Sequence, residues 1–291
     1  MNRFVRFHLP RSRLDGVLRW GLIAAALAAG SVFLLVFLFL LKEAGPAFHT
    51  PGAARFFSDG EWFPNSGSFG LTPMLLATLA TTFGALLLAT PVGLGAAVFA
   101  RFFAPRWLAP IFHRLIELLA GIPSVVFGLW GLLVLVPAIS GNLGGPGQSL
   151  LAAILVLALM ILPTIALTAH AALRAVPAPV LLGATALGLS RGAVVRRIAL
   201  PTAAQGIRSG ILLALARGLG ETMAILMIAG NKVQPPYDLL QPVRTLSANI
   251  ALELGYANEA HRSALFFGGL VLTSTVILFL IPRLQMQRGS Q

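Results

Sequence analysis

The stretch that decides the fold lies between two long apolar segments and reads Gly188-Leu189-Ser190-Arg191-Gly192-Ala193-Val194-Val195-Arg196-Arg197-Ile198-Ala199-Leu200-Pro201. Its spacing is Gly-x9-Ile-x-Leu-Pro. Its three arginines keep it out of a bilayer core, where each would cost at least about 2.5–3.5 kcal/mol, and a glycine and a proline bound it. A basic loop between two apolar segments indicates a helical membrane protein whose loop lies in the aqueous phase.

The composition supports this class. The chain is 57% hydrophobic and 10% charged, whereas soluble domains carry about 25% charged residues. A helix of roughly 20 apolar residues crosses a bilayer core of about 30 Å, and continuous apolar runs favour helices over barrel strands. The sequence therefore predicts an all-α polytopic membrane protein with six transmembrane helices, near 20–41, 71–100, 115–138, 149–170, 209–230 and 262–282.

The net charge of +12 is distributed as expected for a membrane protein, which argues against a nucleic-acid partner. With the N-terminus inside, the inner segments hold 15 Lys/Arg and the outer loops hold five. This asymmetry is the positive-inside pattern. We therefore expect a multi-pass membrane protein, in contact with lipids, with both termini cytoplasmic. Its parts would be a basic cytoplasmic tail at 1–19, a transmembrane domain at 20–282 and a cytoplasmic tail at 283–291.

The sequence offers little for catalysis. There is no cysteine and no His-Glu-x-x-His pattern, so we expect no metal site. The two lysines, Lys42 and Lys232, do not stand in Gly-x4-Gly-Lys-Ser/Thr, so the chain cannot form a P-loop. We expect no enzymatic activity and no cofactor bound by this chain.

One pattern suggests a hydrolase instead. Residues 188–192 match Gly-x-Ser-x-Gly, and Asp238 and His261 follow in the order of a catalytic triad. However, no strand pattern precedes Ser190, and the predicted topology places Ser190 inside and the other two residues outside. A triad divided by a bilayer cannot function, so the sequence argues against this alternative.

The long inner loop, 171–208, is suited to docking. It is expected to form one or two short helices between about 180 and 200. Val194, Val195 and Ile198 recur at roughly helical spacing and would form an apolar face. Such a face with a basic flank fits a groove on a soluble partner.

Charge also stands within the fifth predicted span. Arg217 and Glu221 are four residues apart and would share one helix face. The pair could be an ion pair that only stabilises the bundle, or Arg217 could meet an anion in a wet pathway, since a guanidinium matches oxyanions bidentately. Because intramembrane charges usually mark function, we favour the second interpretation.

Four stretches resemble one family of transport proteins. They are Trp62-Phe63-Pro64, Ala120 to Gly131, Arg217 to Asn231, and Pro242 to Ile250. They are similar to the PstC-type permease of the bacterial phosphate ABC importer, and the loop quoted first resembles the segment by which such permeases dock on their ATPase. That loop departs from the Glu-Ala-Ala with which many of these permeases begin, because Leu182, Gly183 and Ala184 stand there instead.

The resemblance implies the type I ABC importer permease (MetI-like) fold, a location in the bacterial inner membrane and a share in an ATP-driven phosphate pathway. The implied partners are a PstA-like permease, a PstB-like ATPase dimer that binds ATP and Mg, a periplasmic phosphate-binding protein and inorganic phosphate. The implied substrate pathway holds Arg217, Glu221, Thr222 and Ser124. The implied ATPase-coupling residues are Gly188, Arg191, Ile198, Leu200 and Pro201. A permease for another oxyanion, such as molybdate or sulfate, and a phosphate-sensing membrane subunit that does not transport remain alternatives.

Overall fold

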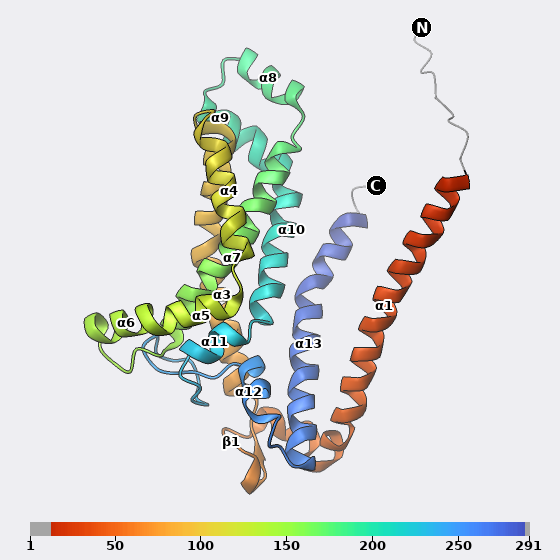
Figure 1. Ribbon diagram of the computed structural model, residues 1–291, viewed down its shortest axis with the longest axis vertical. Coiled ribbons are helices and arrows are strands. Elements are labelled where there is room, and N and C mark those ends of the chain that lie inside the picture. The colour runs from red at the N-terminus through yellow and green to blue at the C-terminus, as the bar shows by residue number, and fades with distance from the viewer. Residues whose placement is uncertain (1–12, 289–291) are drawn as a thin grey trace.

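The computed structural model describes residues 13–288 and is built almost entirely of helices. Six helical stretches are long and apolar enough to cross a membrane: Gly16–Ala47, Thr72–Phe103, Ser124–Leu143, Leu150–Arg174, Arg191–Leu219 and Glu259–Leu280. The predicted number of spans is therefore confirmed. The start of α1 (Arg13–Ala47) and the end of α13 (Glu259–Arg288) lie toward the same end of the bundle as the inner loop (Figure 1).

The centre of the bundle is α7 (Leu150–Arg174), which packs between α3 (Thr72–Val98) and α10 (Leu200–Leu219). Two thirds of its apolar window is buried, far more than in any other described span. The small residues Gly210, Ala214 and Gly218 of α10 are buried against α7 and α3, where a side chain on Gly210 would collide with Thr168. This stripe of small residues, whose partner the sequence could not identify, is thus an interface within the chain.

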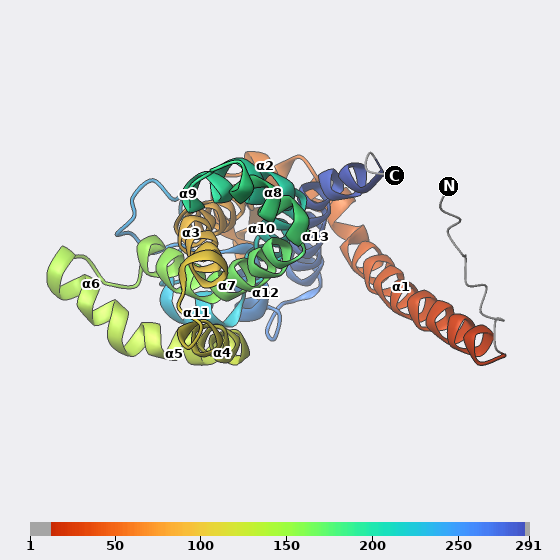
Figure 2. The ribbon, with the colours of Figure 1, turned by 90° about the horizontal axis from the view of Figure 1, so that it is seen from above.

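The third span is broken rather than continuous, unlike the predicted 115–138. Helix α4 (Leu108–Gly121) runs along α7, and the chain turns at Ile122 and Pro123 into α5 (Ser124–Trp130). A π-helical turn (Gly131–Leu135) and α6 (Val136–Leu143) continue the new direction. Figures 1 and 2 both show α5 and α6 projecting sideways from the bundle. Pro123 ends a helix because it lacks an amide donor, whereas α3 and α7 continue through Pro91 and Pro163.

The fifth span also breaks, although it contains no proline. The predicted span was 209–230, but α10 ends at Leu219, and α11 (Met223–Ile228) begins after three non-helical residues. On its other side α10 is continuous with α9 (Arg191–Val194) through a π-helical turn (Val195–Ala199). The helical rod therefore starts in the predicted loop and stops earlier than expected.

The end of the bundle opposite the inner loop is closed by short elements. These are α2 (Arg55–Ser58), α12 (Leu246–Glu253) and a hairpin of two short antiparallel strands, β1 (Trp62–Phe63) and β2 (Ser68–Phe69). They cover an aromatic cluster in which Phe56 stacks on Phe267 with ring centroids 4.3 Å apart. The hairpin is a minor departure from the all-α prediction.

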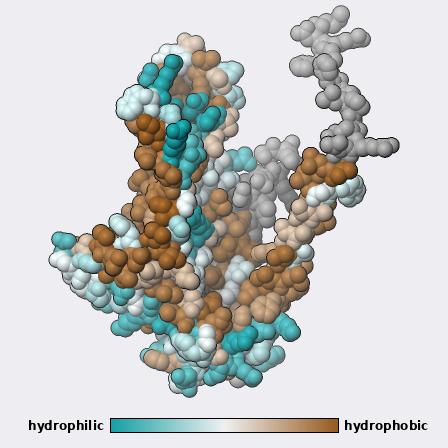
Figure 3. Space-filling model, viewed as in Figure 1, coloured by the Kyte–Doolittle hydropathy of each residue, from teal (hydrophilic) through white to brown (hydrophobic). Residues whose placement is uncertain are grey.

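Helix α1 stands apart from the central bundle. It contacts α13 and otherwise diverges from the bundle in both ribbon views (Figures 1 and 2). Its apolar side chains are mostly exposed, and hydrophobic residues cover it and the flank of α4 and α5 in Figure 3. Such surfaces are expected to face lipid or another subunit, since an exposed apolar area of this size marks an interaction surface.

Candidate functional site: two helix breaks, a coupling segment and an outer network

The two helix breaks lie side by side. Helices α5 and α11 pack in parallel, because Gly128 lies against Ala224 and Gly131 lies against Ile228. A side-chain carbon on Gly128 would stand 2.9 Å from the α-carbon of Ala224, so the two backbones nearly touch. The register puts the start of α5 level with the residues just before α11. Non-helical backbone at membrane depth is tolerated where it is buried in protein or lines a watery cavity.

The predicted pairing of Arg217 with Glu221 is wrong. Arg217 lies in the last turn of α10, and Glu221 lies after the helix has ended, so the two do not share a helix face. Arg217 is exposed, and its Nη1 donates to Oγ1 of Thr164 on α7 at 3.3 Å. Within the described residues it forms no ion pair.

Glu221 instead organises the break. Its Oε1 accepts a hydrogen bond from the amide of Ala224 at 3.3 Å, which caps α11. Its main-chain carbonyl accepts one from Oγ of Ser247 at 2.8 Å. A carboxylate at a helix start is stabilised by the free amides and the helix dipole. Glu221 therefore shapes the break and leaves Arg217 without an acidic partner in the described chain.

The other two predicted pathway residues also stand at the breaks. Ser124 is the first residue of α5, and Thr222 immediately precedes α11. Oγ1 of Thr222 donates to the carbonyl of Gly220 at 3.1 Å, and its side chain faces a hollow that it shares with Ser247 of α12. The parallel register brings Ser124 to the level of the second break, although these residues are nearly one hundred positions apart.

The predicted coupling residues gather at one end of the bundle. Helix α8 (Ala178–Ala186) is followed by Gly188, whose φ of +79° suits glycine because it carries no side chain. Ser190 then caps α9 by accepting from the amide of Ala193 at 3.4 Å. Arg191 begins α9, Ile198 lies in the π-helical turn, and Leu200 and Pro201 open α10.

The apolar side chains exposed at this end of the bundle are not those of the predicted docking face. Val194 and Val195 are buried inside the chain and Ile198 is half-buried, so these residues anchor the segment to its own bundle. The exposed apolar side chains belong to the preceding helix and its end: Val180 is 45% exposed, Leu182 is 67% exposed and Leu187 is 84% exposed. The valines are buried because α8 folds over α9, a contact that helical spacing alone cannot reveal.

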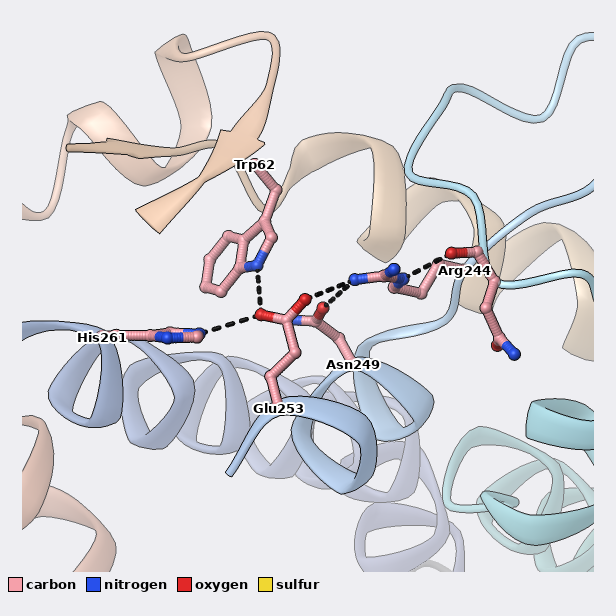
Figure 4. Close-up of polar contacts among 6 residues, drawn as sticks. Trp62, Arg244, Asn249, Glu253 and His261 are labelled. Atoms are coloured by element: carbon pink, nitrogen blue, oxygen red, sulfur yellow. Dashed lines mark hydrogen bonds and ion pairs between the residues drawn. The ribbon is translucent and has the colours of Figure 1, made fainter. Parts of the chain in front are cut away.

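A buried polar network at the opposite end was not predicted (Figure 4). The carboxylate of Glu253 accepts from Nε1 of Trp62 at 2.7 Å and lies 2.8 Å from Nε2 of His261. Its other oxygen accepts from Nη1 of Arg244 at 2.6 Å. Arg244 also donates to the side chain of Asn249 and to the main chain of residue 231. The network joins the hairpin, α12, α13 and the loop before α12.

A sequence signal for part of this network existed. Asn249 and Glu253 are four residues apart in an otherwise apolar segment, which predicts one polar face on a helix. Nothing in the sequence indicates that Trp62, 191 positions away, supplies a donor.

The network also bears on the hydrolase alternative. His261 binds Glu253, whereas Ser190 caps α9 at the far end of the bundle, so the two do not form a triad. Within residues 13–288 no group of three His, Asp or Glu side chains is arranged to hold a metal ion.

Comparison with known proteins identifies the class. Residues 89–288 match the family described as the binding-protein-dependent transport system inner membrane component, and the chain belongs to it. The "phosphate transport system permease protein PstC" of Xylella fastidiosa strain Temecula1 is 38% identical over 257 residues, covering 81% of this chain and 79% of that one. The protein of the same name from Pasteurella multocida strain Pm70 is 34% identical, covering 88% and 91%. Within its class, the chain therefore belongs to the PstC-type permeases.

A solved structure supports the fold. The MetNI methionine ABC transporter, in an inward-facing conformation, has a chain with a TM-score of 0.61 at 21% identity, covering 76% of this chain and 96% of that one. The predicted type I ABC importer permease fold is confirmed. The chain is thus a multi-pass membrane component of a transport system, a class of membrane subunit rather than of enzyme.

Proposed function

We propose that this chain forms half of the transmembrane path for inorganic phosphate in an ATP-driven importer. The names of its PstC relatives support phosphate as the substrate. The observation that carries the proposal is the position of Arg217 at the edge of a helix break, exposed and without an acidic partner in the described chain.

The energetics favour a transient anion at Arg217. An arginine near the bilayer centre costs at least about 2.5–3.5 kcal/mol, so it is retained where water or a partner compensates it. A guanidinium presents two parallel donors that match two oxygens of a phosphate. Thr164 orients one end of the guanidinium, which leaves other donors available.

The neighbouring residues have supporting roles in this proposal. Ser124 and Thr222 would offer hydroxyl groups to the passing anion at the two breaks. Glu221, which caps α11, would hold the shape of the second break and, by its negative charge, prevent phosphate from resting too tightly beside Arg217.

The proposed complex contains a PstA-like permease as the other half of the path, a PstB-like ATPase dimer and a periplasmic phosphate-binding protein. ATP and Mg would bind to the ATPase. Both termini and the segment 171–208 would be cytoplasmic. This is consistent with the start of α1, the end of α13 and that segment lying toward the same end of the bundle (Figure 1). The ATPase would engage the exposed apolar side chains of α8, while Gly188, Arg191, Ile198, Leu200 and Pro201 shape and anchor the link to α10.

Uptake of labelled phosphate by reconstituted vesicles tests the proposal. The Arg217→Gln variant should assemble normally, and its rate of phosphate uptake should fall by about tenfold or more, since a charge-assisted hydrogen bond contributes about 1.5–3 kcal/mol. Arg217→Lys should keep part of it, because it retains charge without the fork. Arg208→Gln, on an exposed turn of the same helix, is the matched control.

Three outcomes would contradict the proposal. Uptake near the parent level by the Arg217→Gln, Glu221→Gln double variant, normalised to assembled complex, would make these residues scaffold. Sulfate or molybdate uptake exceeding phosphate uptake by the parent would identify another oxyanion. Absence of any uptake by an assembled, ATP-hydrolysing parent complex would favour the sensing alternative.

A further inference from the structure

A second cationic feature lies far from the helix breaks, at the end of the bundle that carries α8 and α9. It is a hollow of about 610 Å³. Its charged or titratable lining residues are Arg101, Arg106, His113, His170 and Arg174. The remaining lining residues are three alanines and Pro110, so the walls are small and the polar groups all carry donors.

The hollow is formed where three segments meet. Arg101 comes from the π-helical turn after α3 (Phe99–Phe103), His113 from α4, and His170 and Arg174 from the last turns of α7. The two imidazole rings lie together, with centroids 5.2 Å apart. Three separate elements thus bring positive or protonatable groups to one place.

The charge in this hollow is poorly compensated. The three arginines form no ion pair with any described residue, and Glu117 is the one carboxylate in contact with the five side chains, 3.3 Å from Nε2 of His113. Nδ1 of His170 is buried and has no hydrogen-bond partner among the described residues. An unsatisfied buried polar atom is costly, and like charges repel, so the arrangement favours a bound anion.

Helix α4 adds to this field. Its first turn, at Ala109 and Pro110, lines the hollow. The N-terminus of this 14-residue helix contributes a partial positive charge, which opposes the partial negative charge of the C-terminus of α7 at Arg174.

The larger hollow at the opposite end shows the contrast. There Lys232 and Arg244 are accompanied by Glu61 and Glu253, and Arg244 is already paired with Glu253 at 2.6 Å. Balanced charge of that kind needs no ligand. The hollow beside α4 has no such balance, because three arginines line it and no carboxylate does.

We propose that this hollow binds a phosphate group, presented either by free inorganic phosphate or by the headgroup of an anionic phospholipid. Arginine forks bind phosphate oxygens bidentately, and three of them around small walls leave room for one such group. The site is separate from Arg217, and the proposal does not depend on the proposed transport path.

The test compares two double variants of the full chain in its assembled complex, both built on Arg217→Gln so that the proposed path cannot contribute. Arg106→Gln with Arg174→Gln removes two cations from the hollow. Arg114→Gln with Arg208→Gln removes two exposed cations that do not line it. In one arm, equilibrium dialysis with labelled inorganic phosphate is carried out in phosphatidylcholine nanodiscs. In the other, native mass spectrometry counts the phosphatidylglycerol retained by the complex.

Binding is compared with that of the Arg217→Gln single variant. We expect Arg106→Gln with Arg174→Gln to lower binding of at least one probe by about tenfold or more, and the control pair to change it by less than about twofold. Loss in the dialysis arm assigns the site to free phosphate, and loss in the lipid arm assigns it to a headgroup. If the first variant fails to assemble, the single change Arg106→Glu, in an exposed turn, replaces it. Equal binding by the hollow and control variants in both arms would overturn the proposal.

Discussion

Replacing Glu253 by Gln tests whether the network in Figure 4 holds the outer end of the protein together. The change keeps the length of the side chain and removes its charge. In the parent the carboxylate meets Trp62, His261 and Arg244 at 2.7, 2.8 and 2.6 Å. A neutral amide has one acceptor oxygen, and its NH₂ group would face a donor.

The magnitude follows from burial. The side chains of Arg244 and Glu253 are 19% and 11% exposed, so neither charge is well solvated. Breaking a buried ion pair by removing one partner costs about 3–5 kcal/mol. Arg244 keeps its bonds to Asn249 and to the main chain of residue 231, which reduces the expected loss of unfolding free energy to about 2–3 kcal/mol.

The assay is the thermal unfolding midpoint of the purified protein in detergent. At about 2–4 °C per kcal/mol for a chain of this size class, Glu253→Gln should lower the midpoint by about 5–10 °C. Trp62→Phe removes one donor and keeps the aromatic packing, so its shift should be about a third as large. Glu61→Gln, an exposed acid on the same rim, should shift it by less than about 1 °C. A shift for Glu253→Gln no larger than that of Glu61→Gln would refute the reasoning.

Three further predictions concern packing, topology and coupling. Gly128→Leu should separate α5 from α11 and lower both the unfolding midpoint and phosphate uptake, whereas Gly141→Ala, with open space around it, should change neither; normal behaviour of the leucine variant would show that the close contact is unimportant. In the cysteine-free chain, an impermeant thiol reagent applied to intact cells should label Tyr256→Cys and spare Leu187→Cys, both highly exposed; the reverse labelling would invert the proposed topology. Gly188→Val should strain the backbone at φ +79° and reduce recovery of the ATPase with the complex; unchanged recovery and uptake would remove Gly188 from the coupling segment.

The sequence predicted the spans because hydropathy depends on local composition. The predicted span 115–138 missed the break at Pro123, because a proline can end a helix or be accommodated in it, as Pro91 and Pro163 are in α3 and α7. It missed the break after Leu219, where Gly220 is the C-cap residue, because glycine is also common inside transmembrane helices. At that break Oγ of Ser247, from α12, donates to the carbonyl of Glu221, a contact that the local sequence cannot reveal.

Burial of the docking segment was missed for a related reason. Val194 and Val195 have the spacing of an exposed apolar face, but both are buried where α8 packs against α9 and the π-helical turn. Amphipathic spacing shows that a face is buried against something and does not say against what. The resemblance to PstC-type permeases identified the positions of interest, whereas the orientation of each side chain required the tertiary fold.

The structure gives a physical link between the proposed coupling segment and the helix breaks. From Arg191 to Leu219 the chain is helical without interruption, which at about 1.5 Å per residue spans roughly 43 Å. A stiff rod of this length carries a displacement at α9 to Arg217, close to its other end. The rod packs closely on α7, where Gly206 faces Ala172 and Gly210 faces Thr168. Because α11 begins after a non-helical break, the rod can shift without dragging α11 from its tight contact with α5.

We therefore expect ATPase-driven movement of α9 to change the position of Arg217 relative to Thr164 while the α5–α11 pair stays fixed. Distances between spin labels on α9, α10 and α5, measured with and without a bound ATP analogue, check this: a constant α10-to-α5 distance would contradict it.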